Sequence, residues 1–266
     1  MSLIQVKYPS AALSRNVEYS ALIPNDTPPD WKAGNKHYER PMQTLILLHG
    51  FSACGADWIG ASGIEELSMR YHLAVLMPNG ENSFYLDREE TGAAYSTFVA
   101  KELLEHARSL FHLSERREDT FIGGYSMGGF GAIRNGLKYA ETYSKIIGLS
   151  NALICYMLPE LKRSKGNEIA NLAYYERIFG DLDDAHNTDK HPEYIANELL
   201  RVGKEIPALY LACGTEDFLL DVNRKWNDYL TAQGIKHFYT EDAGSHDWVF
   251  WNKYLAPALE WLTSAD

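Results

Sequence analysis

The stretch 120–131, TFIGGYSMGGFG, constrains the fold of this chain more than any other. Its short apolar run bounded by glycines is typical of a buried strand, and the small residues that follow lead into an apolar pattern typical of a closely packed helix. Ser126 therefore lies on the turn between a strand and a helix. Gly124 and Gly128, two residues to either side, let the two elements approach each other.

The spacing Gly124-x-Ser126-x-Gly128 is that of a nucleophile elbow, a sharp turn that exposes a serine hydroxyl above a sheet. Three fixed positions match by accident in about one chain of this length in ten, so the strand and helix around them carry much of the argument. At the start of a helix, the dipole and the free N–H of Met127 favour an oxyanion on a bound carbonyl. The stretch predicts a nucleophilic Ser126.

Composition narrows the classes of partner and compartment. A chain of 266 residues fits one α/β domain over 1–266, with no linker or repeat. Its net charge of -11 disfavours nucleic acid and anionic membrane surfaces, so a small neutral substrate is expected. Three widely spaced cysteines fit neither a disulfide framework nor a zinc site, which favours the reducing cytoplasm. We find no leader and no apolar run of membrane-spanning length, and we expect no cofactor.

Apolar runs along the chain predict the architecture. Runs at 44–48, 73–77, 120–125, 145–149 and 208–212 indicate strands covered on both faces, and 237–240 completes the sheet. Alternating segments at 3–8 and 17–23 indicate antiparallel edge strands, followed by a loop over 25–41. Helices are expected around 65–70, 95–113, 221–233 and 247–262, the last interrupted or restarted at Pro257. The prediction is a mostly parallel, twisted α/β sheet with helices on both faces.

More than fifty residues separate the sixth strand from the next, too many for one crossover helix. We therefore predict an inserted cap over 153–206 that covers the bound substrate. Its acidic end indicates a solvated face rather than a metal site, because His186 and His191 have no recognised ligand spacing. Several aromatic side chains of the cap either contact the substrate or attach the cap to the core: Tyr156, Tyr174, Tyr175, Phe179 and Tyr194.

A serine nucleophile needs a histidine base and a carboxylate that orients it. On this kind of sheet the chain order is Ser, acid, His, with the partners on loops after later strands. His186 and His191 lie in the predicted cap and His237 in a strand, which leaves His246 in a loop before the last helix. Asp217 directly follows the strand at 208–212 and is the predicted acid.

Two other carboxylates compete with Asp217. Asp221 lies about one turn further on, where a carboxylate more often caps a helix, and Glu216 is expected to point elsewhere. For the oxyanion, the N–H of Phe51 is the natural second donor beside that of Met127. Gly50 lets the backbone approach the substrate, and His49 is interpreted as a residue that holds the loop.

With these residues assembled, the chain resembles the esterase D-like α/β-hydrolases, most closely carboxylesterases of the tributyrin esterase type. The resemblance spans 44–262 and implies hydrolysis of short acyl esters. It implies relatives such as acetyl xylan and feruloyl esterases, S-formylglutathione hydrolases and mycolyl transferases, some of which form homo-oligomers. It is carried by these motifs: His49-Gly50-Phe51, Asp57-Trp58, Met77-Pro78-Asn79, Gly124-Tyr125-Ser126-Met127-Gly128-Gly129, Gly214-Thr215-Glu216-Asp217-Phe218-Leu219 and His246-Asp247-Trp248-x-x-Trp251.

Two departures concern the substrate. S-formylglutathione hydrolases usually have a cysteine four residues after the oxyanion-loop histidine, whereas Cys54 is five residues after His49. Their His-Ser-Tyr ending is here His246-Asp247-Trp248. We therefore expect an ester of a small alcohol or a sugar, with a glutathione thioester, acyl transfer to an alcohol, or non-catalytic binding as alternatives. Substrate contacts are assigned to four residues: Gly50, Trp58, Tyr125 and Trp248.

Overall fold

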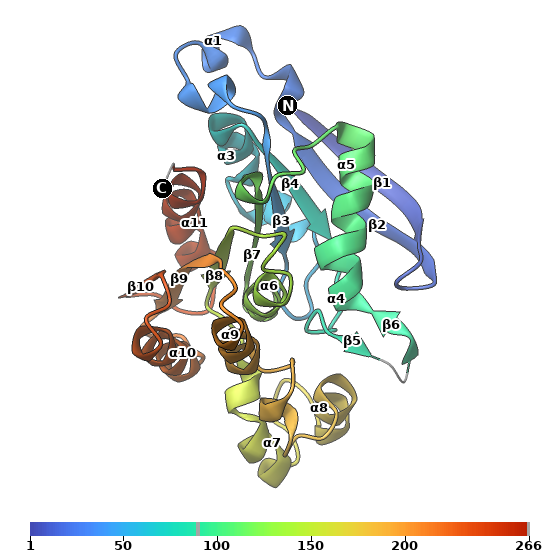
Figure 1. The fold of residues 1–266 in the computed structure, drawn as a ribbon, viewed down its shortest axis with the longest axis vertical. Helices are drawn as coiled ribbons and strands as arrows, with labels where there is room; N and C mark the ends of the chain where they lie inside the picture. Colours follow the sequence, from blue (N-terminus) through green and yellow to red (C-terminus); the bar gives the residue numbers. More distant parts are fainter. Residues whose placement is uncertain (89–90, 265–266) are drawn as a thin grey trace.

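The computed structural model describes residues 1–88 and 91–264, which form an eight-stranded sheet with helices on both faces (Figure 1). The strand order is β1-β2-β4-β3-β7-β8-β9-β10. β1 and β2 pair antiparallel, β2 and β4 pair antiparallel, and the remaining neighbours pair parallel. The strands are β1 (Ser2–Ser10), β2 (Arg15–Ile23), β3 (Gln43–Leu48), β4 (Leu73–Pro78), β7 (Thr120–Tyr125), β8 (Lys145–Leu149), β9 (Ala208–Gly214) and β10 (His237–Asp242), with a small hairpin of β5 (Asp87–Arg88) and β6 (Ala93–Ala94).

The helices divide between the two faces of the sheet. Leu45 and Leu47 of β3 point into a core with α3 and α11, whereas Ile46 and Leu48 point into a second core with α5, α6, α9 and α10. The helices are α1 (Pro29–Lys32), α2 (Asp57–Ala61), α3 (Ile64–Tyr71), α4 (Tyr95–Thr97), α5 (Leu103–Phe111), α6 (Met127–Lys138), α7 (Leu158–Ser164), α8 (Leu172–Phe179), α9 (Pro192–Arg201), α10 (Leu220–Ala232) and α11 (Trp248–Thr263). Shorter turns are η1 (Pro24–Asp26), η2 (Lys36–Glu39), η5 (Arg117–Asp119), η6 (Ile154–Tyr156) and η7 (Ala185–Asn187), and η4 (Phe98–Glu102) is a π-helical turn.

Four details differ from the sequence prediction. β2 is an inner strand rather than an edge strand, because its second half, including Ser20 and Leu22, is buried between β1 and β4. The predicted loop 25–41 contains the short elements α1 and η2. The helix expected over 95–113 is composite, with the π-helical turn between α4 and α5. α11 continues through Pro257 as one helix.

The segment 153–206 contains two different kinds of structure. α7 and α8 project from one end of the molecule (Figure 1). α9 instead packs against α6 and contributes Ala196 and Leu199 to a core beneath the sheet. The residues around α9 therefore form the crossover from β8 to β9, and only the part before it extends beyond the sheet layers.

Candidate active site

Ser126 lies at the end of β7 and at the N-cap of α6, with φ 54° and ψ −120°. A non-glycine residue rarely adopts positive φ, so the turn is strained. A Cβ atom on Gly124 would lie 2.4 Å from the Gly128 carbonyl oxygen, and one on Gly128 would lie 2.3 Å from the Leu48 carbonyl oxygen. Only glycine fits at both positions, because the strand, the turn and the helix are in backbone contact.

His246 and Asp217 approach Ser126 from two separate loops. His246 precedes α11 in the loop after β10, and Asp217 follows β9. The Nε2 atom of His246 is 2.9 Å from Ser126 Oγ, and its Nδ1 atom is 2.8 Å from Asp217 Oδ2. The three side chains form a continuous hydrogen-bonded chain, although 120 residues separate Ser126 from His246. This arrangement allows His246 to accept the serine proton while Asp217 holds its tautomer.

Three polar groups surround the Asp217 carboxylate. Besides His246, the Leu219 N–H donates to Oδ1 at 2.9 Å, and the nearby Ser150 hydroxyl lowers the pKa of the carboxyl group. Burial raises the pKa of Asp217, but these hydrogen bonds outweigh burial, and the net pKa lies below its usual value. Asp217 therefore stays ionised and accepts from His246.

Ser150 lies beside the predicted triad and was not singled out by the sequence prediction. It directly follows β8 with φ 49°, and its Oγ atom accepts from Trp251 Nε1 at 3.1 Å. Trp251 also contacts His246 edge to face, with ring centroids 5.1 Å apart. A signal for Ser150 existed, because the residue after a buried parallel strand lies at the same sheet edge as Ser126 and Asp217.

The two amide N–H groups assigned to the oxyanion hole are not used in hydrogen bonds within the described part of the chain. Neither the Phe51 N–H nor the Met127 N–H has an acceptor in the part of the chain that the structure describes. Met127 begins α6, so its N–H has no partner within the helix. Two free donors beside Ser126 can bind the negative charge that forms on an attacked carbonyl.

His49 holds the loop that carries Phe51. It is fully buried, its Nε2 atom accepts from the Gly80 N–H at 2.8 Å, and its Nδ1 atom donates to the Gly50 carbonyl oxygen at 2.8 Å. Burial lowers the pKa of His49, which keeps the ring neutral for both contacts. The Tyr85 hydroxyl donates to the His49 carbonyl oxygen at 2.9 Å. His49 therefore has a structural role in the loop.

A small cavity of about 30 Å³ adjoins Ser126. A cavity of this size holds about two water-sized spheres, so it admits a small acyl group. Tyr175 is the residue from the predicted cap aromatics that lines it, while Tyr174 contacts Phe51 edge to face with ring centroids 5.6 Å apart. The lining residues are Phe51, Phe84, Ser126, Met127, Ala152, Ile154, Ile169, Tyr175, Phe218 and Leu219.

The residues assigned to substrate binding lie elsewhere. Trp58 is fully buried, and its ring packs edge to face on Tyr125 and Trp248 at 5.1 and 5.2 Å between centroids. A Cβ atom on Gly50 would lie 2.5 Å from the Tyr125 ring, so Gly50 makes room for this aromatic cluster. None of the four residues lines the cavity beside Ser126. The assignment of substrate contacts to these four residues stays a prediction.

The rival residues have other partners. Glu216 accepts from the Gly244 N–H, and Asp221 lies in the first turn of α10. His237 contacts the Ile235 carbonyl oxygen and Asn227, and His191 caps α9. His186 is exposed. Among residues 1–88 and 91–264, no three His, Cys, Asp or Glu side chains converge as a metal site.

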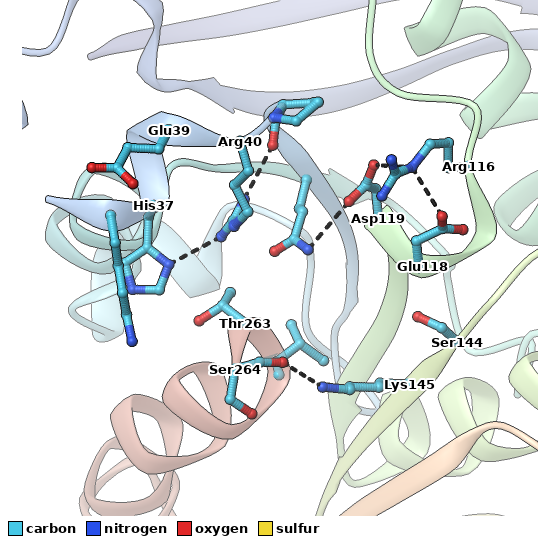
Figure 2. A pocket seen from close by; sticks show the side chains of 14 residues that line it. His37, Glu39, Arg40, Arg116, Glu118, Asp119, Ser144, Lys145, Thr263 and Ser264 are labelled. Carbon is cyan, nitrogen blue, oxygen red and sulfur yellow. Dashed lines mark hydrogen bonds and ion pairs between the residues drawn. The ribbon is translucent and has the colours of Figure 1, made fainter. Parts of the chain in front are cut away.

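A larger cavity of about 550 Å³ lies far from this chemistry (Figure 2). It is lined by Gln43 at the start of β3, Asp119 before β7 and Lys145 at the start of β8, which are the amino ends of strands whose carboxyl ends carry the Ser126 site. Figure 2 shows Arg116 paired with Glu118 and Asp119, so the charges lining this cavity largely neutralise one another. None of the predicted site residues lines it.

The mostly parallel sheet and the Ser-His-Asp geometry define a serine hydrolase of the α/β-hydrolase fold. Residues 10–262 match the family described as "Putative esterase". An acetyl esterase of Caldicellulosiruptor saccharolyticus is 43% identical over 263 residues, which are 99% of this chain and 98% of that protein. The chain therefore belongs to this esterase family, and it is a carboxylic ester hydrolase.

Solved structures agree with this assignment. A fluorophosphonate-binding serine hydrolase of Staphylococcus aureus is 27% identical, covers 99% of both chains and has a TM-score of 0.84. An S-formylglutathione hydrolase of the same organism is 27% identical over 99% of both chains, with a TM-score of 0.82. Within the described ranges, no helix combines the length and apolar character needed to cross a bilayer.

Proposed function

We propose that Ser126, His246 and Asp217 are the catalytic triad of this esterase and that its preferred substrates are acetyl esters. Ser126 Oγ attacks the ester carbonyl, and His246 accepts the proton and returns it to the departing alcohol oxygen. The amides of Phe51 and Met127 hold the oxyanion in both steps. Water, activated by His246, then attacks the acyl-serine carbonyl and releases the acid. The observation that supports this mechanism is the unbroken hydrogen-bonded chain from Asp217 to Ser126.

The test of the nucleophile is Ser126→Ala. We expect its kcat for nitrophenyl acetate to fall by roughly four to six orders of magnitude, because the members of a triad act as a unit. A fluorophosphonate probe should label wild type and the control variant Ser109→Ala, in which an exposed serine of α5 is changed. Labelling of Ser126→Ala, or hydrolysis at the wild-type rate, would show that another residue is the nucleophile.

The acetyl preference rests on two observations. The cavity beside Ser126 is about 30 Å³, and a relative at 43% identity is named an acetyl esterase. Nitrophenyl esters from acetyl to octanoyl should show kcat/KM highest for acetyl and falling with each added carbon. Acetylated and feruloylated oligosaccharides and S-formylglutathione belong in the same panel, and added acceptor alcohols test acyl transfer. A maximum at hexanoyl or longer would contradict an acetyl-sized pocket.

We also propose that the protein acts in the reducing cytoplasm. Cys54, Cys155 and Cys213 are free thiols, and Cys54 is exposed. An exposed thiol persists more readily where glutathione keeps the compartment reduced. Cell fractionation of a native source tests this proposal, and recovery from the medium would contradict it.

A further inference from the structure

A second pocket of about 290 Å³ separates α8 from α6. Its lining comes from four parts of the chain: the β5 region, α6, α8 and the segment just before α9. We call it the basic pocket, and define it by Leu86, Asp87, Arg88, Arg134, Lys138, Arg177, Ile178, Gly180, Asp189 and Lys190. Ser126 is absent from this lining. The pocket is therefore distinct from the cavity that adjoins the nucleophile.

Positive charge is in excess among the lining residues that the structure describes. Five of these side chains are cationic and two are carboxylates, although the chain as a whole has a net charge of -11. The Asp87 carboxylate accepts two hydrogen bonds from Thr97, one from its N–H at 3.0 Å and one from its hydroxyl at 2.9 Å. Asp189 is shared between Arg134 at 2.6 Å and Lys138 at 2.9 Å. Within residues 1–88 and 91–264, the two carboxylates therefore compensate only part of this cationic charge.

Three of the cations have no carboxylate partner within the described ranges: Arg88, Arg177 and Lys190. The guanidinium of Arg88 lies over the Tyr95 ring at 5.7 Å, and its buried Nε has no acceptor in the described part of the chain. Arg177 lies over the Tyr174 ring at 5.9 Å. Stacking on rings orients both guanidinium groups but does not use their hydrogen-bond donors.

Gly180 leaves space for the ammonium group of Lys190. Lys190 Nζ donates to the Phe179 carbonyl oxygen at 3.0 Å. Gly180 has φ +71°, and a Cβ atom there would lie 2.9 Å from that same Nζ. A side chain at position 180 would therefore require Lys190 Nζ to shift.

We propose that the basic pocket binds a phosphate group, either free or carried on the alcohol part of an ester substrate. A multivalent oxyanion neutralises several cations at once and offers oxygens to the planar forks of Arg88 and Arg177. The volume of about 290 Å³ admits a small phosphorylated molecule as well as inorganic phosphate. Nucleic acid does not suit the remaining surface, because the chain has 36 acidic against 25 basic side chains.

The bound phosphate would join two parts of the chain. Arg177 and Lys190 come from the inserted segment, whereas Arg88 and Arg134 come from β5 and α6. Phosphate binding should therefore order residues 172–190 against the sheet. The test is saturable stabilisation of the whole protein by inorganic phosphate, measured by thermal unfolding and calorimetry at constant ionic strength with chloride.

The key variant carries Arg88→Gln and Arg177→Gln, which remove charge but keep polar side chains. We expect its affinity for inorganic phosphate to fall at least tenfold. The control Arg163→Gln changes an exposed arginine of α7 outside the pocket and should bind like wild type. Melting in chloride alone verifies that each variant is folded. No saturable phosphate effect in wild type, or equal losses in both variants, would overturn the proposal.

A kinetic experiment distinguishes free phosphate from a phosphate group carried by the substrate. Acetyl esters of a phosphorylated and of a neutral alcohol are compared in wild type and in the double variant. If the substrate carries the group, kcat/KM falls only for the phosphorylated ester and inorganic phosphate competes with it. If the anion is free, the double variant changes the two esters alike. Either pattern supports a phosphate site in the basic pocket and shows whether the phosphate is free or carried by the substrate. Wild-type kinetics of the double variant for both esters, together with unchanged phosphate binding, would refute the proposal.

Discussion

The side chains around Ser126 have different roles in the candidate active site. In the proposed mechanism Ser126 and His246 exchange the proton and Asp217 orients His246, whereas Ser150 lies beside Asp217 and Trp251 contacts both Ser150 and His246. The three residues of the proposed triad follow from the motif and from the chain order expected of this fold. Ser150 belongs to no such pattern, because its importance comes from the orientation of one hydroxyl toward a carboxylate.

Replacing Ser150 with alanine tests this second group of contacts. A hydrogen bond to a carboxylate contributes about 1.5 kcal/mol, so Ser150→Ala should lower kcat about tenfold. Ser150 also lowers the pKa of Asp217, so that pKa should rise in the variant. The measurement is kcat at neutral pH, where Asp217 is ionised in both proteins. Ser245→Ala, at an exposed position beside His246, is the control, and a wild-type kcat in Ser150→Ala would contradict the role of Ser150.

Ile154 tests the size of the acyl cavity. It lines the cavity and is almost fully buried, so Ile154→Ala should enlarge the space beside Ser126. One methylene changes specificity by about 1–3 kcal/mol, and the butyryl-to-acetyl ratio of kcat/KM should rise about tenfold. Ile206→Ala, outside the cavity lining, should keep the wild-type ratio. An unchanged ratio in a folded Ile154→Ala protein would mean that the acyl group binds elsewhere.

Individual helices position these groups through their ends. Ser126 is the N-cap residue of α6 and Asp247, beside His246, is that of α11. The Asp247 carboxylate accepts from the N–H groups of Val249 and Phe250. α9 is capped differently, by Nδ1 of the buried His191, which accepts from the Glu193 N–H at 3.3 Å. Burial, and then the charge of His186, lowers the pKa of His191 to about 4.

This cap should make the fold sensitive to acid. Between an unfolded pKa of about 6.5 and the folded value of about 4, the unfolded chain binds more protons at position 191, so stability falls as pH falls. From pH 7 to pH 5, His191→Asn should lose about 2 kcal/mol less than wild type, because asparagine caps without titrating. Urea unfolding at both pH values measures this. His112→Asn, at an exposed position, is the control, and equal losses in wild type and His191→Asn would contradict the prediction.

Across the entire chain, the inserted segment is attached to the sheet layers by polar contacts as well as by apolar ones. Arg134 of α6 is 2% exposed, and it donates to both the carbonyl and the carboxylate oxygens of Asp189. A buried guanidinium without its carboxylate is costly, whereas an exposed pair such as Lys162 and Asp183 contributes little.

Asp189→Asn should therefore destabilise the protein by about 2 kcal/mol, less than for a fully buried pair because Asp189 is partly exposed. Asp183→Asn breaks the exposed pair and should cost under about 0.5 kcal/mol. Urea unfolding midpoints at low salt measure both. If Asp183→Asn were the more damaging change, the attachment of the inserted segment would not depend on Arg134.

The amino-acid order was sufficient to predict the sheet with helices on both faces, the sharp turn at Ser126, and the pairing of Asp217 with His246. These features depend on short-range backbone sterics, on hydrophobic periodicity and on where parallel strands end, all of which are readable along a line. The narrow cavity, the roles of Ser150 and Trp58, and the convergence of Arg88 with Arg177 were not readable. They depend on how side chains from distant segments fill the space between packed elements, and that space exists only once the chain has folded.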